Sequence, residues 1–97
     1  MQTEIELSRH ASLKLKERRL RISEIEKTVK NPDSVSYDLI SKTLVAVRRA
    51  KIDGIETNLI VPFVKTGNVI KVVTVYPCRD LAKEIDRKEG TRWVRIK

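Results

Sequence analysis

The sequence predicts a single α+β domain over residues 1–97, in which two N-terminal helices pack on a twisted four-stranded antiparallel sheet and a C-terminal helix or tail follows. The apolar spacing changes from four residues to two after Pro32, which is typical of helices followed by strands. The run VIKVVTVY at 69–76 is the most β-rich segment. A chain of 97 residues fits one domain, and with only three Gly and three Pro most of it should be regular.

The first helix is expected over residues 8–20, because Ser8 is a good N-cap and an apolar line follows it. A second helix is expected over 23–31. Ser23 and Glu26 have the spacing of a capping box, and Pro32 disfavours helical geometry in the residue before it.

The four strands are expected at 35–40, 44–52, 57–65 and 69–76. Asp53-Gly54 is a hairpin signal, and residues 66–68 (TGN) form another turn. Pro62 lacks a ladder donor, which indicates an edge position or a bulge. VIKVVTVY is apolar on both faces, so a central position is expected. Residues 79–89 should be helical and 91–97 a short strand or tail.

The charge balance indicates a polyanionic partner. Lys and Arg number 21 against 13 Asp and Glu, a formal charge of +8, which attracts phosphates and releases counterions when they bind. The single cysteine, Cys78, allows no internal disulfide and fits a reducing cytoplasm. No apolar stretch is long enough to cross a bilayer and no leader opens the sequence, so a soluble cytoplasmic protein is expected.

Several chemistries are disfavoured. One Cys and one His cannot build a zinc site alone, and the isolated glycines form no phosphate loop. We therefore expect no metal and no cofactor. With four aromatic residues, a platform that stacks several bases is not expected.

The first helix carries a polar line. His10, Lys14 and Arg18 are spaced by four and should project on one side. His10 could act as a general acid or base near neutral pH, while the two cations hold a phosphate. The alternative is that His10 packs against the helix start and both cations are solvated.

Four further cations lie on the expected strands: Arg48, Arg49, Lys65 and Lys71. Strand alternation places Arg48 and Arg49 on opposite faces of the sheet. Lys71 is a charge within the apolar run; it either serves a site or reaches past its neighbours to water.

Part of the sequence resembles a known family. The string His10-Ala11…Lys14…Glu17-Arg18, then Ile22-Ser23-x-x-Glu26 and Asn31-Pro32, resembles small prokaryotic proteins related to BrnT-type toxins, within the RelE/ParE-like toxin–antitoxin superfamily. The resemblance covers about residues 7–77 and implies a RelE-like fold. Active relatives are similar to metal-independent ribonucleases, which use basic and His or Tyr groups on the sheet. This chain has Lys14 where the motif usually carries Arg, and the residues after Tyr76 match nothing in the pattern.

These observations leave three hypotheses open. The first is a toxin-like ribonuclease or RNA-binding protein, with His10, Lys71 and Arg48 as catalytic residues and with nucleic-acid contacts from Lys14, Arg18, Arg49 and Lys65. The second is a non-catalytic nucleic-acid-binding module with the same basic face. The third is an interaction domain that docks an acidic antitoxin-like partner. A homodimer is compatible with each.

Overall fold

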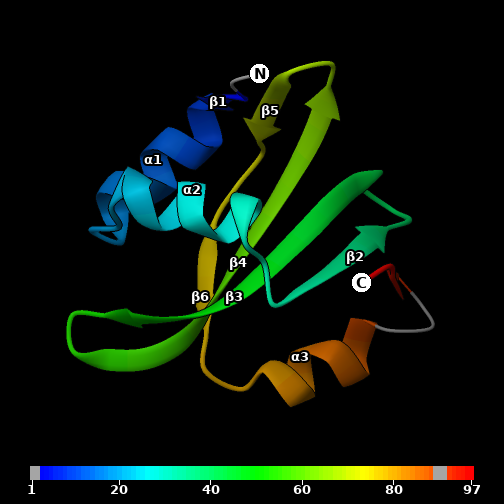
Figure 1. Ribbon diagram of the computed structural model, residues 1–97. Coiled ribbons are helices and arrows are strands. Elements are labelled where there is room, and N and C mark those ends of the chain that lie inside the picture. The colour runs from blue at the N-terminus through cyan, green and yellow to red at the C-terminus, as the bar shows by residue number, and fades with distance from the viewer. Residues whose placement is uncertain (1–2, 89–91) are drawn as a thin grey trace.

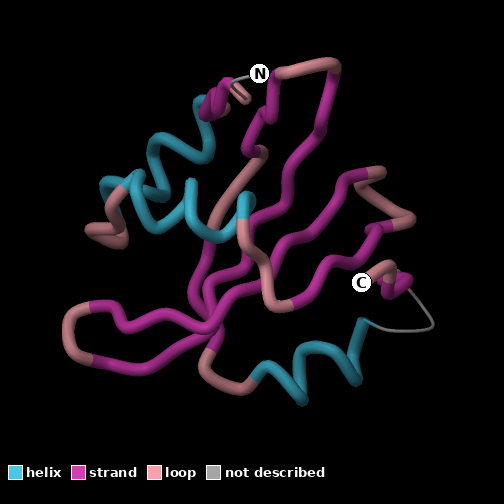
Figure 2. The backbone as a smooth tube through the Cα atoms, viewed as in Figure 1, coloured by secondary structure: helices cyan, strands magenta, loops and turns pink. Residues whose placement is uncertain are grey.

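The computed structural model describes residues 3–88 and 92–97. Within these ranges it contains three helices and seven strands (Figures 1 and 2). In chain order they are β1 (Glu4–Leu7), α1 (Arg9–Glu17), α2 (Ile22–Lys30), β2 (Ser34–Asp38), β3 (Thr43–Ile52), β4 (Ile55–Thr66), β5 (Val69–Val72), β6 (Tyr76–Cys78), α3 (Leu81–Lys88) and β7 (Trp93–Arg95).

The strands form one mixed sheet, so the predicted four-stranded antiparallel sheet of the RelE-like fold is wrong. The strand order is β1-β5-β4-β3-β2-β7, and β6 pairs with β4 beside this path. Strand β1 precedes both helices and pairs in parallel with β5. Its sequence is only EIEL, too short and too acidic to be recognised from its pattern. The chain therefore has a mixed α/β fold in which α1 and α2 connect the first strand to the rest of the sheet.

The run at 69–76 is divided between two strands instead of forming one. Residues 73–75, between β5 and β6, do not form part of a strand. The Val73 N–H donates to the Pro62 carbonyl at 2.9 Å. Because the nitrogen and carbonyl of a strand residue point toward the same neighbour, the Pro62 nitrogen faces this segment and has no hydrogen to donate. Pro62 thus lies where β4 changes partner from β6 to β5, in the sheet interior and not at an edge.

The core consists of two apolar clusters on opposite faces of the sheet. Along β3, Ala46 and Ala50 belong to the cluster that receives α1 and α2, whereas Val45 and Val47 belong to the one that receives α3. Figure 1 shows α3 well apart from the two N-terminal helices. Helix α3 confirms the helix expected near residues 79–89, although residue 89 lies outside the described ranges.

The two N-terminal helices begin in different ways. The Ser8 hydroxyl accepts a hydrogen bond from the Ala11 N–H at 3.0 Å and donates to the Val73 carbonyl at 2.6 Å, so the predicted N-cap is confirmed. The N-cap of α2 is Arg21, with no side-chain capping hydrogen bond. The predicted capping box starting at Ser23 is therefore wrong, and the helix begins one residue earlier.

The β3–β4 hairpin closes through the turn that the sequence predicts. Asp53 and Gly54 have φ angles of 51° and 78°, the left-handed region that a two-residue primed turn requires. Ile52 pairs with Ile55 across this turn.

None of the helices in the described part of the chain has the length and apolarity needed to span a membrane.

Candidate nucleic-acid interface

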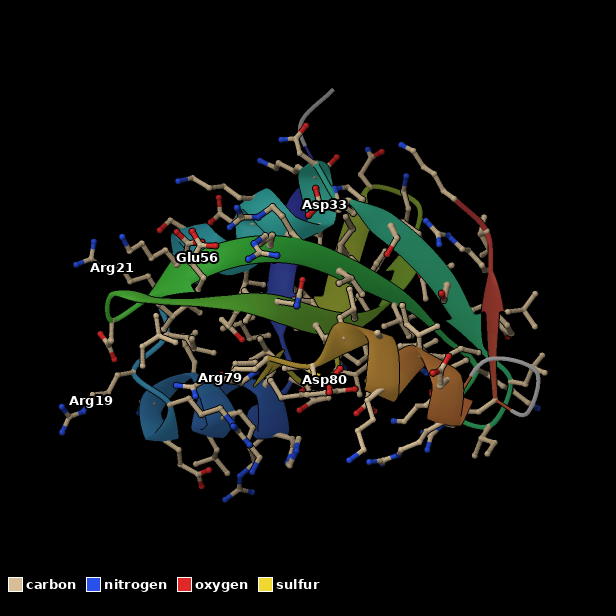
Figure 3. The ribbon with its side chains drawn as sticks, turned by 90° about the horizontal axis from the view of Figure 1, so that it is seen from below. Arg19, Arg21, Asp33, Glu56, Arg79 and Asp80 are labelled. Carbon is tan, nitrogen blue, oxygen red and sulfur yellow. The ribbon has the colours of Figure 1, made fainter. Side chains whose placement is uncertain are left out.

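A groove lies where the α1–α2 turn meets the tip of the β3–β4 hairpin. Its first part, which we call the cationic hollow, has a volume of about 270 Å³. It is lined by Arg19, Leu20, Arg21, Glu24, Lys51, Ile52 and Asp53. In Figure 3, Arg19 and Arg21 lie at the same end of the molecule as the hairpin tip.

The second part of the groove, which we call the apolar hollow, has a volume of about 240 Å³. It is lined by Ile52, Asp53, Ile55, Thr57, Pro77 and Arg79. Ile52 and Asp53 line both hollows, so the two adjoin. The groove therefore combines a mainly apolar compartment with a charged one.

Cations dominate the charge of this groove. Arg19, Arg21, Lys51 and Arg79 are all exposed, and the structure gives none of the four an ion pair within residues 3–88 and 92–97. Two acidic residues also line the groove, and one of them, Glu24, is paired with Arg48. Four cations that have no ion pair among the described residues, beside one unpaired carboxylate, give this region a positive field that attracts anions.

Helix α2 adds to this positive field. Its N-terminus lies at the cationic hollow, because the N-cap residue Arg21 lines it. The Glu24 N–H donates to the Arg21 carbonyl at 3.0 Å, and without a side-chain cap the amides of Ile22 and Ser23 before it can donate to solvent or a ligand. A phosphate at such a helix end interacts favourably with both the amides and the helix dipole.

Thr57 provides an unusual polar group in the apolar hollow. It is 6% exposed, and its hydroxyl is the one buried side-chain polar atom among the described residues that has no hydrogen-bond partner. A buried hydroxyl without a partner destabilises a fold by about 1–3 kcal/mol. A ligand atom that reaches this hydroxyl would therefore satisfy a group that the protein leaves open.

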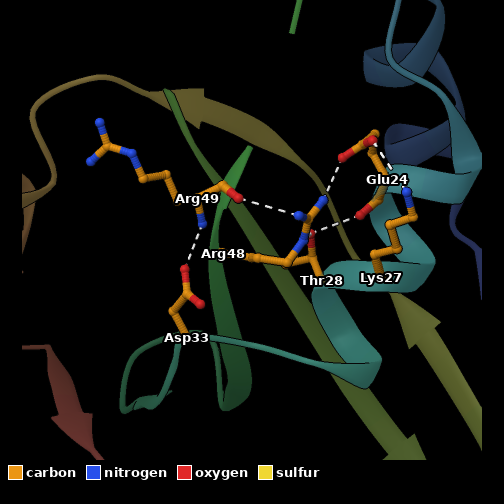
Figure 4. A network of polar contacts seen from close by, with 6 residues as sticks. All are labelled: Glu24, Lys27, Thr28, Asp33, Arg48 and Arg49. Carbon is orange, nitrogen blue, oxygen red and sulfur yellow. Dashed lines mark hydrogen bonds and ion pairs between the residues drawn. The ribbon is translucent and has the colours of Figure 1, made fainter. Parts of the chain in front are cut away.

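The structure gives Arg48, a predicted catalytic residue, several partners within the fold (Figure 4). Its guanidinium forms an ion pair with Glu24 and donates to the Thr28 hydroxyl at 3.4 Å and the Arg49 carbonyl at 3.2 Å. These contacts attach α2 to β3. The arrangement joins two elements of the fold and leaves little of the Arg48 charge for a ligand.

Arg49 lies on the opposite face, as strand alternation predicts. Its guanidinium pairs with Glu56 at 2.8 Å, and its backbone N–H donates to the Asp33 carboxylate at 2.7 Å. Arg49, which the sequence predicts to contact nucleic acid, is thus paired with a carboxylate of the same sheet.

The polar line on α1 is present, but it does not lead into the groove as a set. His10 is exposed in the first turn, and Arg18 is exposed at the C-cap. The two are roughly 12 Å apart along the helix axis, at 1.5 Å per residue. Lys14 between them is paired with Glu17 at 3.3 Å.

Lys65 and Lys71 are exposed at the other end of the sheet, where β4 pairs with β5. Lys71 aligns with Val64 on one side and Glu6 on the other. Its neighbours Ile70 and Val72 are in the cluster beneath α1, so Lys71 points to the opposite face of the sheet. The structure therefore does not bring Lys71 together with His10.

Two other titratable groups lie on strand β6. Burial raises the pKa of Tyr76 to about 12 and also raises the pKa of the Cys78 thiol. Both side chains are therefore protonated near neutral pH, and neither provides a ready base or thiolate.

Sequence reasoning missed the residues that form the groove. Arg19 and Arg21 flank Leu20 in the α1–α2 turn, Lys51 precedes the hairpin turn, and Arg79 follows β6. In the sequence, each of the four is a basic residue at or near the end of a helix or strand. The loops at such positions often carry function.

No family model matches the chain, and searches of curated proteins and of solved structures give no significant match.

Proposed function

We propose that this chain is an RNA-binding protein that contacts the phosphate backbone through the groove at the α1–α2 turn and the hairpin tip. The observation that carries the proposal is the set of four exposed cations around two adjoining hollows, none of which has an ion pair in the part of the chain that the structure describes. The overall charge of +8 supports a polyanionic ligand. Among the hypotheses raised by the sequence, binding has the strongest geometric support.

The ligand is inferred to be single-stranded because of the shape of the groove. Hollows of 270 and 240 Å³ accommodate parts of a flexible strand, whereas a duplex presents a continuous backbone to a broad face. Positively charged grooves that follow the backbone are typical of proteins that bind single strands.

The test is a fluorescence-anisotropy titration with a labelled RNA of about 10 nucleotides, at about 50 and about 200 mM salt. Wild type is compared with Arg19→Gln/Arg21→Gln and with the charge-matched control Lys65→Gln/Lys71→Gln. The groove variant should bind more weakly and lower the salt slope by about 1.4, the value for two lost phosphate contacts on a single strand. Equal losses in both variants would show that net charge alone drives binding, and the groove would lose its role.

The ribonuclease hypothesis needs a proton acceptor close to the bound phosphate. His10 lies about two turns from Arg18 at the other end of α1, so binding without cleavage is expected. The RNA recovered from the titration, with excess chelator present, should be intact. Cleavage that persists in chelator and disappears in His10→Ala would favour the ribonuclease hypothesis instead.

A further inference from the structure

We propose that the apolar hollow holds one unpaired nucleobase of the bound strand, hydrogen-bonded to the Thr57 hydroxyl, while the adjacent phosphate occupies the cationic hollow. This inference rests on the proposed function and specifies its ligand. A nucleobase is a flat ring with apolar faces and polar edges, and only an unpaired base can enter such a site.

The walls of the hollow suit such a ring. Ile52, Ile55 and Pro77 provide aliphatic surface, and the volume of about 240 Å³ is below the range of about 300–1,000 Å³ typical of drug-sized ligands. Ile55 is a large apolar side chain that remains 46% exposed at the hairpin tip. Covering this surface with a base would remove apolar area from water.

Thr57 gives the wall of the hollow a polar side chain, and its hydroxyl has no partner and almost no contact with solvent in the unbound protein. It lies on β4 within the wall, it is more than nine-tenths buried, and no described atom bonds to it. A base therefore reaches this hydroxyl only as the wall around it shifts on binding, and because a hydroxyl can donate and accept, it can then pair with either kind of group on the base edge.

The lining that the two hollows share favours a nucleotide over a purely apolar ligand. Ile52 and Asp53 line both compartments, so a ligand that extends from the apolar hollow over these two residues reaches Arg21 and Lys51. An apolar ring joined to an anion is the chemistry that this arrangement recognises. Arg79 at the rim of the apolar hollow can contact the phosphate on the other side of the same base.

The experiment compares Thr57→Val with Thr66→Val, the same substitution at an exposed position on the same strand. Binding is measured with an RNA of about 10 nucleotides and with the same strand made abasic. Thr57→Val should weaken binding to the RNA about three- to tenfold, the range expected for one hydrogen bond, and leave the abasic strand unaffected. Thr66→Val should match the wild type with both ligands.

Two further measurements keep the outcome unambiguous. Thr57→Val removes an unsatisfied hydroxyl, so its thermal unfolding midpoint should not fall, and Thr57→Ser should keep wild-type affinity. Unchanged RNA affinity in Thr57→Val, with binding still weakened in Arg19→Gln/Arg21→Gln, would overturn the base pocket and leave the proposed function standing. Unchanged affinity in both variants would overturn the proposed function as well.

Discussion

Arg48 and Arg49 are adjacent in the sequence but have opposite surroundings. Strand alternation directs Arg48 toward α2, where it meets Glu24 and Thr28, and directs Arg49 to the other face, where it meets Glu56. The Arg48 pair is shielded, with side chains 20% and 24% exposed, whereas both side chains of the Arg49 pair are more than 60% exposed. Shielded, hydrogen-bonded pairs are more sensitive to the loss of one partner than exposed pairs.

Replacing each arginine by methionine tests this difference. Arg48→Met should lower the free energy of unfolding by about 1–3 kcal/mol, because Glu24 loses its main partner in a shielded site. Arg49→Met should cost less than about 1 kcal/mol. Urea denaturation measures both. Similar losses in the two variants would contradict the structural role given to Arg48.

Asp38 is a buried carboxylate with a full set of donors. It accepts hydrogen bonds from the Ile40 and Ser41 amides at 2.9 and 3.1 Å, from Arg92 at 2.7 Å and from the Trp93 indole at 3.3 Å. Burial acts to raise the pKa of Asp38, but the hydrogen bonds from Ser41, Arg92 and Ile40 outweigh it, so the pKa lies below its ordinary value of 3.8. The charged form is therefore the one that the fold stabilises.

This shift predicts how stability changes with pH. A carboxyl with a lowered pKa contributes stability above its unfolded pKa and loses it as the pH falls through the folded pKa. Asp38→Asn should therefore be less stable than wild type at pH 7, and the difference should shrink below about pH 4. Urea denaturation across this range measures it, with the exposed Asp86→Asn as control. A difference that does not depend on pH would contradict the assignment.

At the scale of elements, helix α2 begins without a capping side chain. Arg21 occupies the N-cap with extended backbone angles (φ −95°, ψ 140°), which suit a capping serine. The arginine that occupies this position instead adds a positive charge to the N-terminus of the helix, where the helix dipole already places a partial positive charge. This local choice is unfavourable for the helix and favourable for an anion in the cationic hollow.

Arg21→Ser and Arg19→Ser separate these two effects. Both remove one cation from the groove, so both should weaken RNA binding to a similar extent. Arg21→Ser alone supplies a cap, and its free energy of unfolding should rise by about 1 kcal/mol. Thermal unfolding and RNA titration measure the two quantities. If neither variant affects binding, the groove is not the phosphate site.

The elements that the sequence predicted well are those with strong local signals. Ser8 before an amphipathic helix, Pro32 after one, and Asp53-Gly54 between two strands each fix a boundary through their own backbone chemistry. The mixed sheet was not predictable in this way, because β1 is four residues long and its parallel pairing with β5 joins residues as far apart in the sequence as Glu4 and Val69. The division of VIKVVTVY depends on Pro62, which meets that run only in the folded sheet.

At the scale of the whole molecule, composition predicts a polyanionic ligand but does not predict where it binds. The charge of +8 is visible in the sequence, but the cations that line the groove come from the α1–α2 turn, the hairpin and the segment after β6. Cations spaced regularly along strands or helices are the ones that a sequence pattern identifies. Arg48, Arg49 and Lys14 prove to have carboxylate partners, whereas the groove cations lie at irregular positions that only the tertiary fold brings together.

Chemical-shift mapping by NMR tests the central claim most directly, because it reports where on the chain the RNA binds. A single-stranded RNA of about 10 nucleotides is titrated into the labelled protein at low salt. The account predicts that backbone amides of Arg19–Glu24, Lys51–Thr57 and Cys78–Arg79 shift most, with little change near Lys65 and Lys71. Shifts centred on Lys65 and Lys71 with none at the hairpin tip, or no shifts anywhere, would contradict it.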